Sequence, residues 1–202
     1  MSIRVDVWSD FVCPWCFLAT YTLKQLQDSH DVEIVRRAYE LRPEGQPPMP
    51  EHFREYIDKT AQPQFNQTAR QRYGIEINRG PLGVNSRPAL VGAKYANEHG
   101  KSAEYHDAAY RAYWQNAKDI EDRAVLLDIA RSVGLDVDGF AAALDDERYL
   151  NQVLADERQA QEYGLSGVPA MVFENKYLVS GAQPYETLLK VVERVQSEGA
   201  GV

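Results

Sequence analysis

Residues 9–16 read SDFVCPWC, and the segments on either side of this stretch decide the fold. Before it, residues 3–8 alternate with period two and are rich in β-forming residues, which predicts a strand that ends at the turn Ser9-Asp10. From Pro14 onward, apolar residues recur at helical spacing. Proline suits the first position of a helix because its missing N–H would be unpaired there. Cys13 is therefore expected at the N-terminus of a helix that follows a strand.

The first forty residues form one strand–helix–strand unit in this interpretation. Residues 32–41 are a second segment rich in β-forming residues, which predicts a strand parallel to the first. Residues 43–50 then carry four prolines. Because proline removes a backbone donor and fixes the backbone, neither a helix nor a central strand continues through this segment.

Only helical patterns follow between about residue 51 and residue 164. Helices are predicted for a segment ending near Gly74 and for residues 86–98, 102–118, 122–133, 136–144 and 146–163. The candidate N-caps are Ser102, Asp122 and Asp136. The glycines that fit the position after a helix end are Gly100, Gly134 and Gly164. An aromatic run at near-helical spacing predicts a core face rather than a substrate cleft: Tyr105, Tyr110, Tyr113 and Trp114.

The chain returns to β character near its C-terminal end. Residues 170–173 and 177–179, separated by a turn, predict a hairpin, and a final helix follows Pro184. These elements predict an α/β fold with one mixed central sheet covered by helices. The sheet domain would comprise residues 1–45 and 165–202, interrupted by an all-helical insertion domain of residues 46–164.

Cys13 and Cys16 are candidates for a redox-active dithiol. A helix N-terminus offers unpaired N–H groups and about half a positive charge, which favours a thiolate at Cys13. Cys16 lies one turn further into the helix, more shielded but within reach of Cys13, so the two can close into a disulfide. Cys13 is therefore expected to attack a substrate disulfide as the nucleophile, and Cys16 to resolve the mixed disulfide.

A zinc site and a chance pair in a core helix are the alternatives for the two cysteines. A Cys-x-x-Cys pair also opens many four-ligand zinc sites. However, the chain has no second cysteine pair, and its four histidines lie at no ligand spacing to one another. No metal ligand is therefore assigned, and the strand-to-helix context favours redox chemistry over chance burial.

A second feature, independent of the cysteines, is the stretch SGVP at residues 166–169. It stands directly before the predicted hairpin, where proline cannot be an ordinary central ladder residue. A cis bond before Pro169 would turn the backbone groups of Val168 outward, where they can pair with an extended substrate beside the dithiol. A trans proline that opens a strand is the alternative, and trans is the commoner state in folded proteins.

Charge and hydropathy exclude several classes of partner. The formal net charge is −8, whereas nucleic-acid phosphates are bound through clustered Lys and Arg, so nucleic acid is not an expected partner. Charges interrupt the apolar residues of the first segment, and no apolar run is long enough to span a bilayer. A cytoplasmic location without membrane attachment is the expectation, with a mature secreted chain whose signal was removed as the alternative.

Taken together, the motifs resemble the DsbA-like branch of the thioredoxin superfamily, and within it the FrnE-type proteins of its cytoplasmic arm. The resemblance covers almost the whole chain and rests on SDFVCPWC (9–16), LRP (41–43), NSR (85–87), GVP (167–169) and SGAQ (180–183). It implies a thioredoxin fold split by an all-helical domain, a cis bond before Pro169, and thiol–disulfide exchange at Cys13 and Cys16.

The candidate substrate-binding residues surround these motifs, and they are Pro14, Trp15, Val168, Pro169, Asn85 and Gln183. Trp15, between the cysteines, is expected to be partly exposed and to touch substrate. Gln183 is either the N-cap of the final helix or a contact in the site. The expected substrates are proteins or small molecules that contain a disulfide or thiol, acted on by a monomer or homodimer without a bound cofactor.

Two departures from the family pattern limit what the resemblance implies. Related sequences often place a histidine in the helix opened by Asn85, where this chain has Leu90, so any contact from that histidine is absent. Thioredoxins also bury an acidic residue beneath the dithiol as a proton acceptor. Asp6 is the nearest candidate for that role, and the alternative is that Asp6 faces solvent.

Two further functions stay open beside disulfide exchange. The same arm contains hydroxychromene carboxylate isomerases and kappa-class glutathione transferases, which use this helix N-terminus to activate the thiol of glutathione. Those enzymes usually carry serine at the position of Cys13, so the cysteines favour disulfide chemistry, with glutathione as a co-substrate that would bind near Val168, Pro169 and Asn85. The third hypothesis is a chaperone-like module that binds polypeptides in an apolar cleft between core and insertion.

Overall fold

The computed structural model describes residues 2–199. Contacts within the chain divide it into two compact units. We call the part up to Leu41 and from Ala155 onward the sheet unit, and Arg42–Leu154 the helical unit. The division falls before Arg42 and inside a helix that begins in one unit and ends in the other. The assignment of residues 46–164 as a separate domain stays a prediction.

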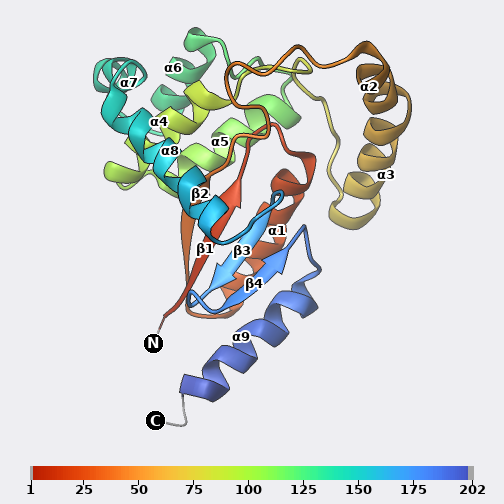
Figure 1. Ribbon diagram of the computed structural model, residues 1–202, viewed down its shortest axis with the longest axis vertical. Helices are drawn as coiled ribbons and strands as arrows, with labels where there is room; N and C mark the ends of the chain where they lie inside the picture. The colour runs from red at the N-terminus through yellow and green to blue at the C-terminus, as the bar shows by residue number, and fades with distance from the viewer. Residues whose placement is uncertain (1, 200–202) are drawn as a thin grey trace. The chain divides into compact units, whose positions relative to one another are not determined.

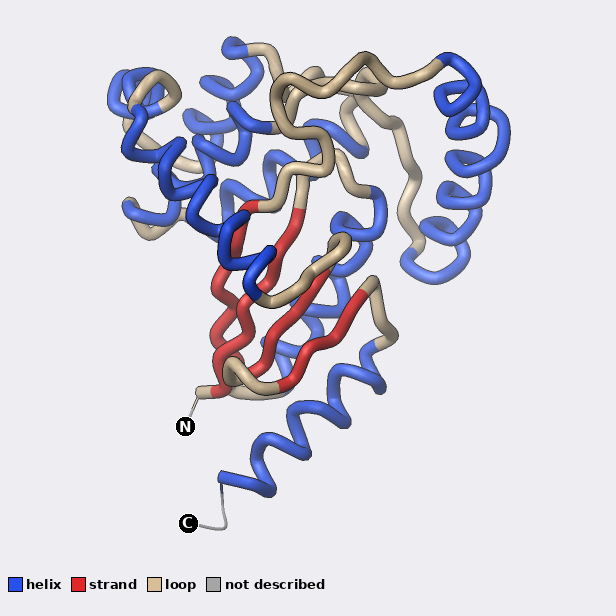
Figure 2. Tube along the Cα trace, viewed as in Figure 1, coloured by secondary structure: helices blue, strands red, loops and turns tan. Residues whose placement is uncertain are grey.

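The sheet unit contains a four-stranded mixed sheet. Its strands are β1 (Ile3–Ser9), β2 (Val32–Ala38), β3 (Ala170–Phe173) and β4 (Tyr177–Ser180), in the order β2-β1-β3-β4 (Figures 1 and 2). β1 is parallel to β2 and antiparallel to β3, and β3 is antiparallel to β4. The predicted α/β class with a mixed sheet is confirmed.

The second strand is shorter than predicted, since it ends at Ala38 rather than near residue 41. Its partner β1 ends at Ser9, whose carbonyl still accepts from the Tyr39 amide at 3.1 Å. The next two amides donate to carboxylates instead of to a strand, Glu40 to Glu157 and Leu41 to Asp10. Ladder pairing therefore stops where β1 runs out.

Helices cover both faces of this sheet. Ile3, Val5 and Val7 point to one face and pack with residues of α1 (Pro14–Ser29) and α9 (Tyr185–Gly199) in one buried cluster. On the other face, Trp8 packs with Ala160 of α8 (Glu147–Glu162). The Trp8 indole N–H also donates to the carbonyl of Asp156 in that helix at 2.9 Å. The period-two pattern of β1 thus supplies each face with its own apolar contacts.

Within the described residues of the helical unit, every regular element is a helix. These are α2 (Glu51–Tyr56), a π-helical turn (Ile57–Ala61), α3 (Gln62–Tyr73), α4 (Arg87–Glu98), α5 (Ser102–Trp114), α6 (Arg123–Ser132), α7 (Val137–Ala143) and the first part of α8. The predicted caps Asp122 and Asp136 are confirmed, since their carboxylates accept from the amides of Ala124 at 2.8 Å and Gly139 at 3.0 Å.

The predicted N-cap at Ser102 is wrong. The N-cap position of α5 is taken by Lys101, whose side chain makes no cap bond. Lys101 follows Gly100 in the left-handed region (φ 68°), and its amide bonds back to the Ala96 carbonyl at 2.8 Å. This tight connection from α4 starts the next helix at Ser102 itself. The C-terminal end was also predicted too late, because α5 ends at Trp114 and Ala117 takes a left-handed conformation (φ 54°).

The core of the helical unit is rich in aromatic side chains. The predicted core face is confirmed, because four of its residues are buried: Tyr105, Tyr110, Tyr113 and Trp114. The ring of Tyr105 lies 5.7 Å from that of Phe140 of α7, centroid to centroid. Gly92 of α4 allows this packing, because a Cβ there would lie 2.4 Å from the Tyr105 hydroxyl and 2.6 Å from the Phe140 ring.

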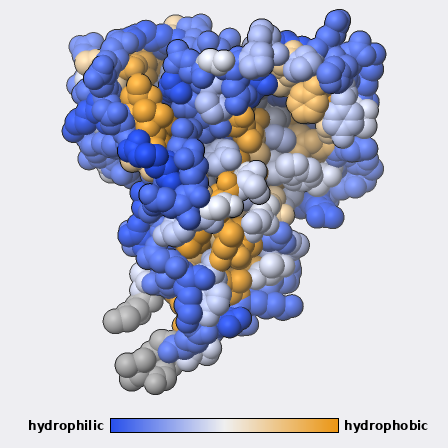
Figure 3. Space-filling view, viewed as in Figure 1, coloured by the Kyte–Doolittle hydropathy of each residue, from blue (hydrophilic) through white to orange (hydrophobic). Residues whose placement is uncertain are grey.

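The surface seen in Figure 3 is mostly hydrophilic, with apolar residues in separate patches. One exposed apolar feature is on α2, where the rings of Phe53 and Tyr56 stack with centroids 6.3 Å apart. Among the helices of residues 2–199, none combines the length and apolarity needed to cross a bilayer.

Candidate active site

Cys13 occupies the N-cap of α1. Its backbone is extended (φ −85°, ψ 118°), and Pro14 takes the first helical position as predicted. The Cys13 sulfur accepts a hydrogen bond from the backbone N–H of Cys16 at 3.4 Å. The first turn of α1 contains no acidic residue that would oppose a negative charge on that sulfur. The Cys13 sulfur therefore lies at the positive end of the helix dipole and takes one of the amides that the first turn leaves without a helical partner.

Cys16 lies one turn into the helix. Cys13 and Cys16 are both buried, at 3% and 2% exposed, so the expectation that Cys16 is the more shielded of the two is not confirmed. Burial, together with the hydrogen bond and charge of neighbouring Cys13, raises the pKa of the Cys16 thiol well above its ordinary value. Cys16 is therefore a neutral thiol near pH 7. The two sulfurs are adjacent but unequal, because only Cys13 receives the amide at the helix start.

Val168 and Pro169 lie against the same sulfur. The bond between them is cis, which confirms the conformation that the family resemblance implied. The Cys13 thiol lies 3.5 Å from the Val168 carbonyl oxygen and is placed to donate to it. The Pro169 carbonyl accepts from the Gly181 amide at 2.7 Å, which ties this loop to the end of β4. Two motifs that are 155 residues apart in the chain therefore meet within the sheet unit.

Asp10 is a site residue that sequence reasoning missed. Its side chain is fully buried, and one oxygen accepts from the Val12 amide at 3.3 Å while the other accepts from the Leu41 amide at 2.7 Å. Its carbonyl accepts from the Cys13 amide at 3.1 Å. Asp10 thus holds the loop before Cys13 against the chain that leaves β2. In the sequence, Asp10 stood out only as part of the turn that ends the first strand and of the stretch SDFVCPWC, neither of which indicated a buried carboxylate.

Asp6, the other acidic candidate, is buried rather than solvent-facing. It accepts hydrogen bonds from Arg4 Nε and Arg37 Nε, each at 2.8 Å. Burial opposes ionisation of Asp6, but these arginines outweigh it and hold the pKa of the carboxyl below its ordinary value. A carboxylate with a lowered pKa is a weak base, so Asp6 is the centre of an ion-pair network rather than a proton acceptor for the dithiol.

The other predicted binding residues lie in varied places. Trp15 is 46% exposed beside the cysteines, as expected. Gln183 lies in the loop before α9 and donates to the Ser180 carbonyl at 2.8 Å. Asn85 belongs to the helical unit, where its side chain accepts from the Arg87 amide at 3.0 Å at the start of α4. Leu90, in place of the family histidine, is buried.

Asn85 also lines an open cavity of about 340 Å³ in the helical unit. Arg42, Arg54, Glu44 and Glu121 contribute charged groups to its wall. Among residues 2–199, no group of three or more His, Cys, Asp or Glu side chains is placed to hold a metal ion.

The family profile of the DSBA-like thioredoxin domain matches residues 4–193. The chain belongs to this family. A curated relative of this DSBA-like protein is uncharacterized protein YwbO of Bacillus subtilis, 28% identical over 98% of this chain and 100% of YwbO. The solved structure of a probable DsbA oxidoreductase, SCO1869 of Streptomyces coelicolor, is 27% identical with a TM-score of 0.82, covering 97% of this chain and 91% of SCO1869.

Two more distant structures share the fold of this DSBA-like protein. A 2-hydroxychromene-2-carboxylate isomerase has a TM-score of 0.81 at 20% identity, covering 98% of each chain. The cytosolic disulfide reductase DsbM of Pseudomonas aeruginosa, solved with glutathione, has a TM-score of 0.73 at 18% identity, covering 95% of this chain and 99% of DsbM. The thioredoxin-like DSBA fold is therefore shown, and the solved structures that share it include oxidoreductases and an isomerase.

Proposed function

We propose that this protein is a thiol–disulfide oxidoreductase in which Cys13 is the nucleophile and Cys16 the resolving thiol. The observation that carries the proposal is the inequality of the two sulfurs. Cys13 accepts the Cys16 amide at the helix start, whereas burial raises the pKa of Cys16. An attacking group must be a thiolate, and a resolving group needs to act only after the first bond has formed.

Each turn of the reaction consists of two exchanges. In the first, the Cys13 thiolate attacks one sulfur of a substrate disulfide, forms the mixed disulfide and releases the other substrate sulfur as a thiolate. In the second, Cys16 attacks the Cys13 sulfur, and its proton passes to the departing substrate sulfur. The Cys13–Cys16 disulfide forms and the remaining substrate thiol leaves. Two electrons pass from the protein to the substrate, and the reverse sequence oxidises a dithiol substrate.

Val168 supplies a backbone acceptor beside the reacting sulfur. Its carbonyl oxygen lies 3.5 Å from the Cys13 sulfur. An extended substrate that places its own disulfide on Cys13 would meet Val168 and Pro169 on one side and the exposed ring of Trp15 nearby. These contacts suit substrates that approach in extended form, which includes disulfide-bonded polypeptides and small disulfides.

Trapping of the mixed disulfide tests the proposal. Cys16→Ser removes the resolving thiol, so we expect this variant to form a stable mixed disulfide with native, disulfide-bonded insulin, detected by non-reducing electrophoresis and intact mass. Cys13→Ser, the matched control, retains Cys16 and should form none. Equal capture by the two variants would overturn the division of roles, and no capture by either would overturn the function.

Glutathione is the second candidate partner, as a co-substrate. Two observations favour it: DsbM, of the same fold, was solved with glutathione, and Asn85 lines a cavity of about 340 Å³ with charged walls. The same trapping experiment distinguishes a protein substrate from glutathione. If Cys16→Ser captures glutathione disulfide but not native insulin, a glutathione-dependent reductase or isomerase is favoured. The cytosolic description of DsbM also supports a cytoplasmic location for this chain.

A further inference from the structure

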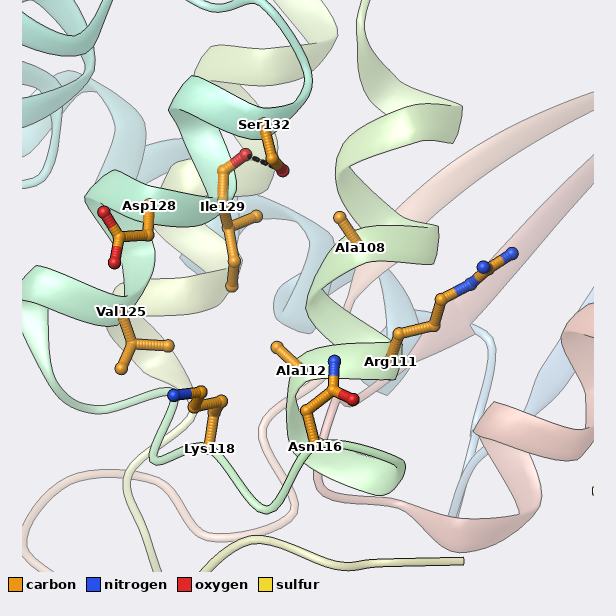
Figure 4. Close-up of a pocket in the computed structure, with 9 residues that line it drawn as sticks. All are labelled: Ala108, Arg111, Ala112, Asn116, Lys118, Val125, Asp128, Ile129 and Ser132. Atoms are coloured by element: carbon orange, nitrogen blue, oxygen red, sulfur yellow. Dashed lines mark hydrogen bonds between the residues drawn. The ribbon is translucent and has the colours of Figure 1, made fainter. Parts of the chain in front are cut away.

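A second cavity lies wholly within the helical unit, between α5 and α6 (Figure 4). Its volume is about 320 Å³, which is the size of the smaller ligand pockets in proteins. Because every lining residue belongs to Arg42–Leu154, its geometry does not depend on the sheet unit. The cavity is also separate from the residues of the proposed thiol chemistry.

The facing sides of α5 and α6 give this cavity an apolar part. Ala108 and Ala112 lie one turn apart on α5, and Val125 and Ile129 lie one turn apart on α6. Figure 4 shows these four side chains directed toward the space between the two helices. The two alanines on α5 leave room that larger residues would fill. The interior can therefore accept a short apolar group.

Most of the polar lining residues already have partners on their own helix. Arg111 is paired with Asp107 at 3.0 Å, and Asp128 with Arg131 at 2.5 Å. Figure 4 shows the Arg111 side chain extending away from the cavity. The Ser132 hydroxyl donates to the Ile129 carbonyl at 2.7 Å. These groups are satisfied and leave no net charge for a ligand.

Lys118 and Asn116 differ from the rest. Within residues 2–199, neither side chain has a hydrogen bond or an ion pair, and both line the cavity. The loop that carries them is nevertheless fixed at its backbone. The Lys118 amide donates to the Ala112 carbonyl at 2.9 Å, and the Ala117 amide to the Asn78 carbonyl at 2.9 Å. A free ammonium and a free carboxamide are thus held at the edge of an apolar cavity.

The backbone of Ala117 is a second indication that the conformation of this loop is fixed. It has φ 54°, a left-handed conformation that costs a residue with a Cβ free energy and is usually given to glycine. Gly80 closes the loop from the other side, because a Cβ there would lie 2.3 Å from the Lys118 carbonyl oxygen. The chain holds Lys118 in place despite the cost at Ala117.

We propose that this cavity binds a small monocarboxylic acid with a short apolar chain. The Lys118 ammonium pairs with the carboxylate, the Asn116 carboxamide donates to it, and the chain lies between Ala112 and Ile129. One uncompensated positive charge at an apolar cavity selects one negative charge on an apolar body. The protein has a formal net charge of −8, which repels anions in general. A lysine without an acidic partner among the described residues is therefore a specific position at which a carboxylate can bind.

Titration with three matched probes tests the proposal, read by ¹H–¹⁵N NMR of the full chain at pH 7. Sodium hexanoate has the charge and the chain, hexanamide lacks the charge, and sodium acetate lacks the chain. We expect hexanoate to shift amides in residues 108–132 saturably, at roughly millimolar affinity. Hexanamide and acetate should bind at least twofold more weakly. Equal binding of hexanamide, or of acetate, would overturn the proposal, as would the absence of any saturable shift.

Two variants locate the site. Lys118→Gln should weaken hexanoate binding about two- to fivefold, the range for an exposed ion pair, while leaving hexanamide unaffected. Ala112→Leu should abolish binding by filling the cavity. The control is Lys59→Gln, an exposed lysine of the same unit outside the cavity, which should bind as the original protein does. If Ala112→Leu fails to fold, Lys118→Gln decides, and unchanged hexanoate affinity in it refutes the site.

Discussion

The sheet unit and the helical unit bury polar groups in different ways. The sheet unit buries four carboxyl side chains, those of Asp6, Asp10, Glu40 and Asp156, which are 2%, 0%, 4% and 4% exposed. Among the described residues of the helical unit, no Asp or Glu side chain is buried, and tyrosine hydroxyls bond to backbone carbonyls instead. Tyr105 donates to Ala89 and Tyr113 to Pro81. The difference separates a unit that buries carboxylates from one whose ion pairs and aspartate caps lie nearer the surface.

The three buried aspartates accept hydrogen bonds from arginines or from backbone amides outside the strand ladder. Asp10 takes the amides of Val12 and Leu41. Asp156 takes the Ala38 amide at 2.7 Å and Arg37 at 3.2 Å. A buried amide without an acceptor costs more free energy than a typical hydrogen bond returns. The acidic groups therefore connect segments that are distant in sequence around the strand end that precedes the dithiol.

Asp10→Ala breaks this arrangement at its most buried point and has the largest expected effect. Two amides lose their acceptor, so we expect the free energy of unfolding to fall by about 3 kcal/mol, measured by urea denaturation at pH 7. Alkylation of Cys13 by iodoacetamide should also become less uniform, because the loop before it is no longer held. Asp28→Ala, an exposed carboxylate on α1 paired only with Lys24, should change stability by less than about 0.5 kcal/mol. A loss in Asp10→Ala no larger than that control would contradict the role of Asp10.

The contrast between Asp10 and the helix caps shows what the sequence can predict. Asp122 and Asp136 were predicted because a cap bonds an amide two or three residues away, so the signal is local. Asp10 was missed because its second partner, Leu41, is 31 residues away and comes near only when β2 pairs with β1. The fold class and the start of α1 followed from local patterns, whereas the cis bond before Pro169 was implied by the family resemblance. The surroundings of the dithiol depend on tertiary contacts that no local pattern encodes.

Asp6→Asn tests whether a buried charge stabilises the sheet unit, through the pH dependence of the free energy of unfolding. Because the folded pKa of Asp6 is lowered, its contribution to stability is present above the usual Asp range, near pH 4, and is lost as the pH falls through the lowered value. Removing the charge should cost about 2 kcal/mol at pH 7, since the bonds from Arg4 and Arg37 lose their charged acceptor. The cost should shrink as the pH is lowered below about 4.

Urea unfolding of the original protein and of Asp6→Asn at pH 7, 5, 4 and 3 measures this difference. Asp28→Asn serves as the control for the general loss of one negative charge on the same unit. A stability difference between Asp6→Asn and the original protein that stays constant over this range would show that Asp6 is not ionised in the folded state, and the ion-pair network would be refuted.

Tyr105→Phe tests the other half of the comparison and has the smallest expected effect. It removes one hydroxyl that donates to the Ala89 carbonyl at 3.2 Å and leaves the ring in place against Phe140. We expect a loss of about 1 kcal/mol, the size of one neutral hydrogen bond. Burial raises the pKa of Tyr105, so the hydroxyl stays neutral and the loss should be the same at pH 5, 7 and 9. Tyr56→Phe, an exposed tyrosine, should be nearly neutral. A stability loss that varied with pH would contradict this role, because a neutral hydroxyl bound to a carbonyl does not ionise between pH 5 and 9.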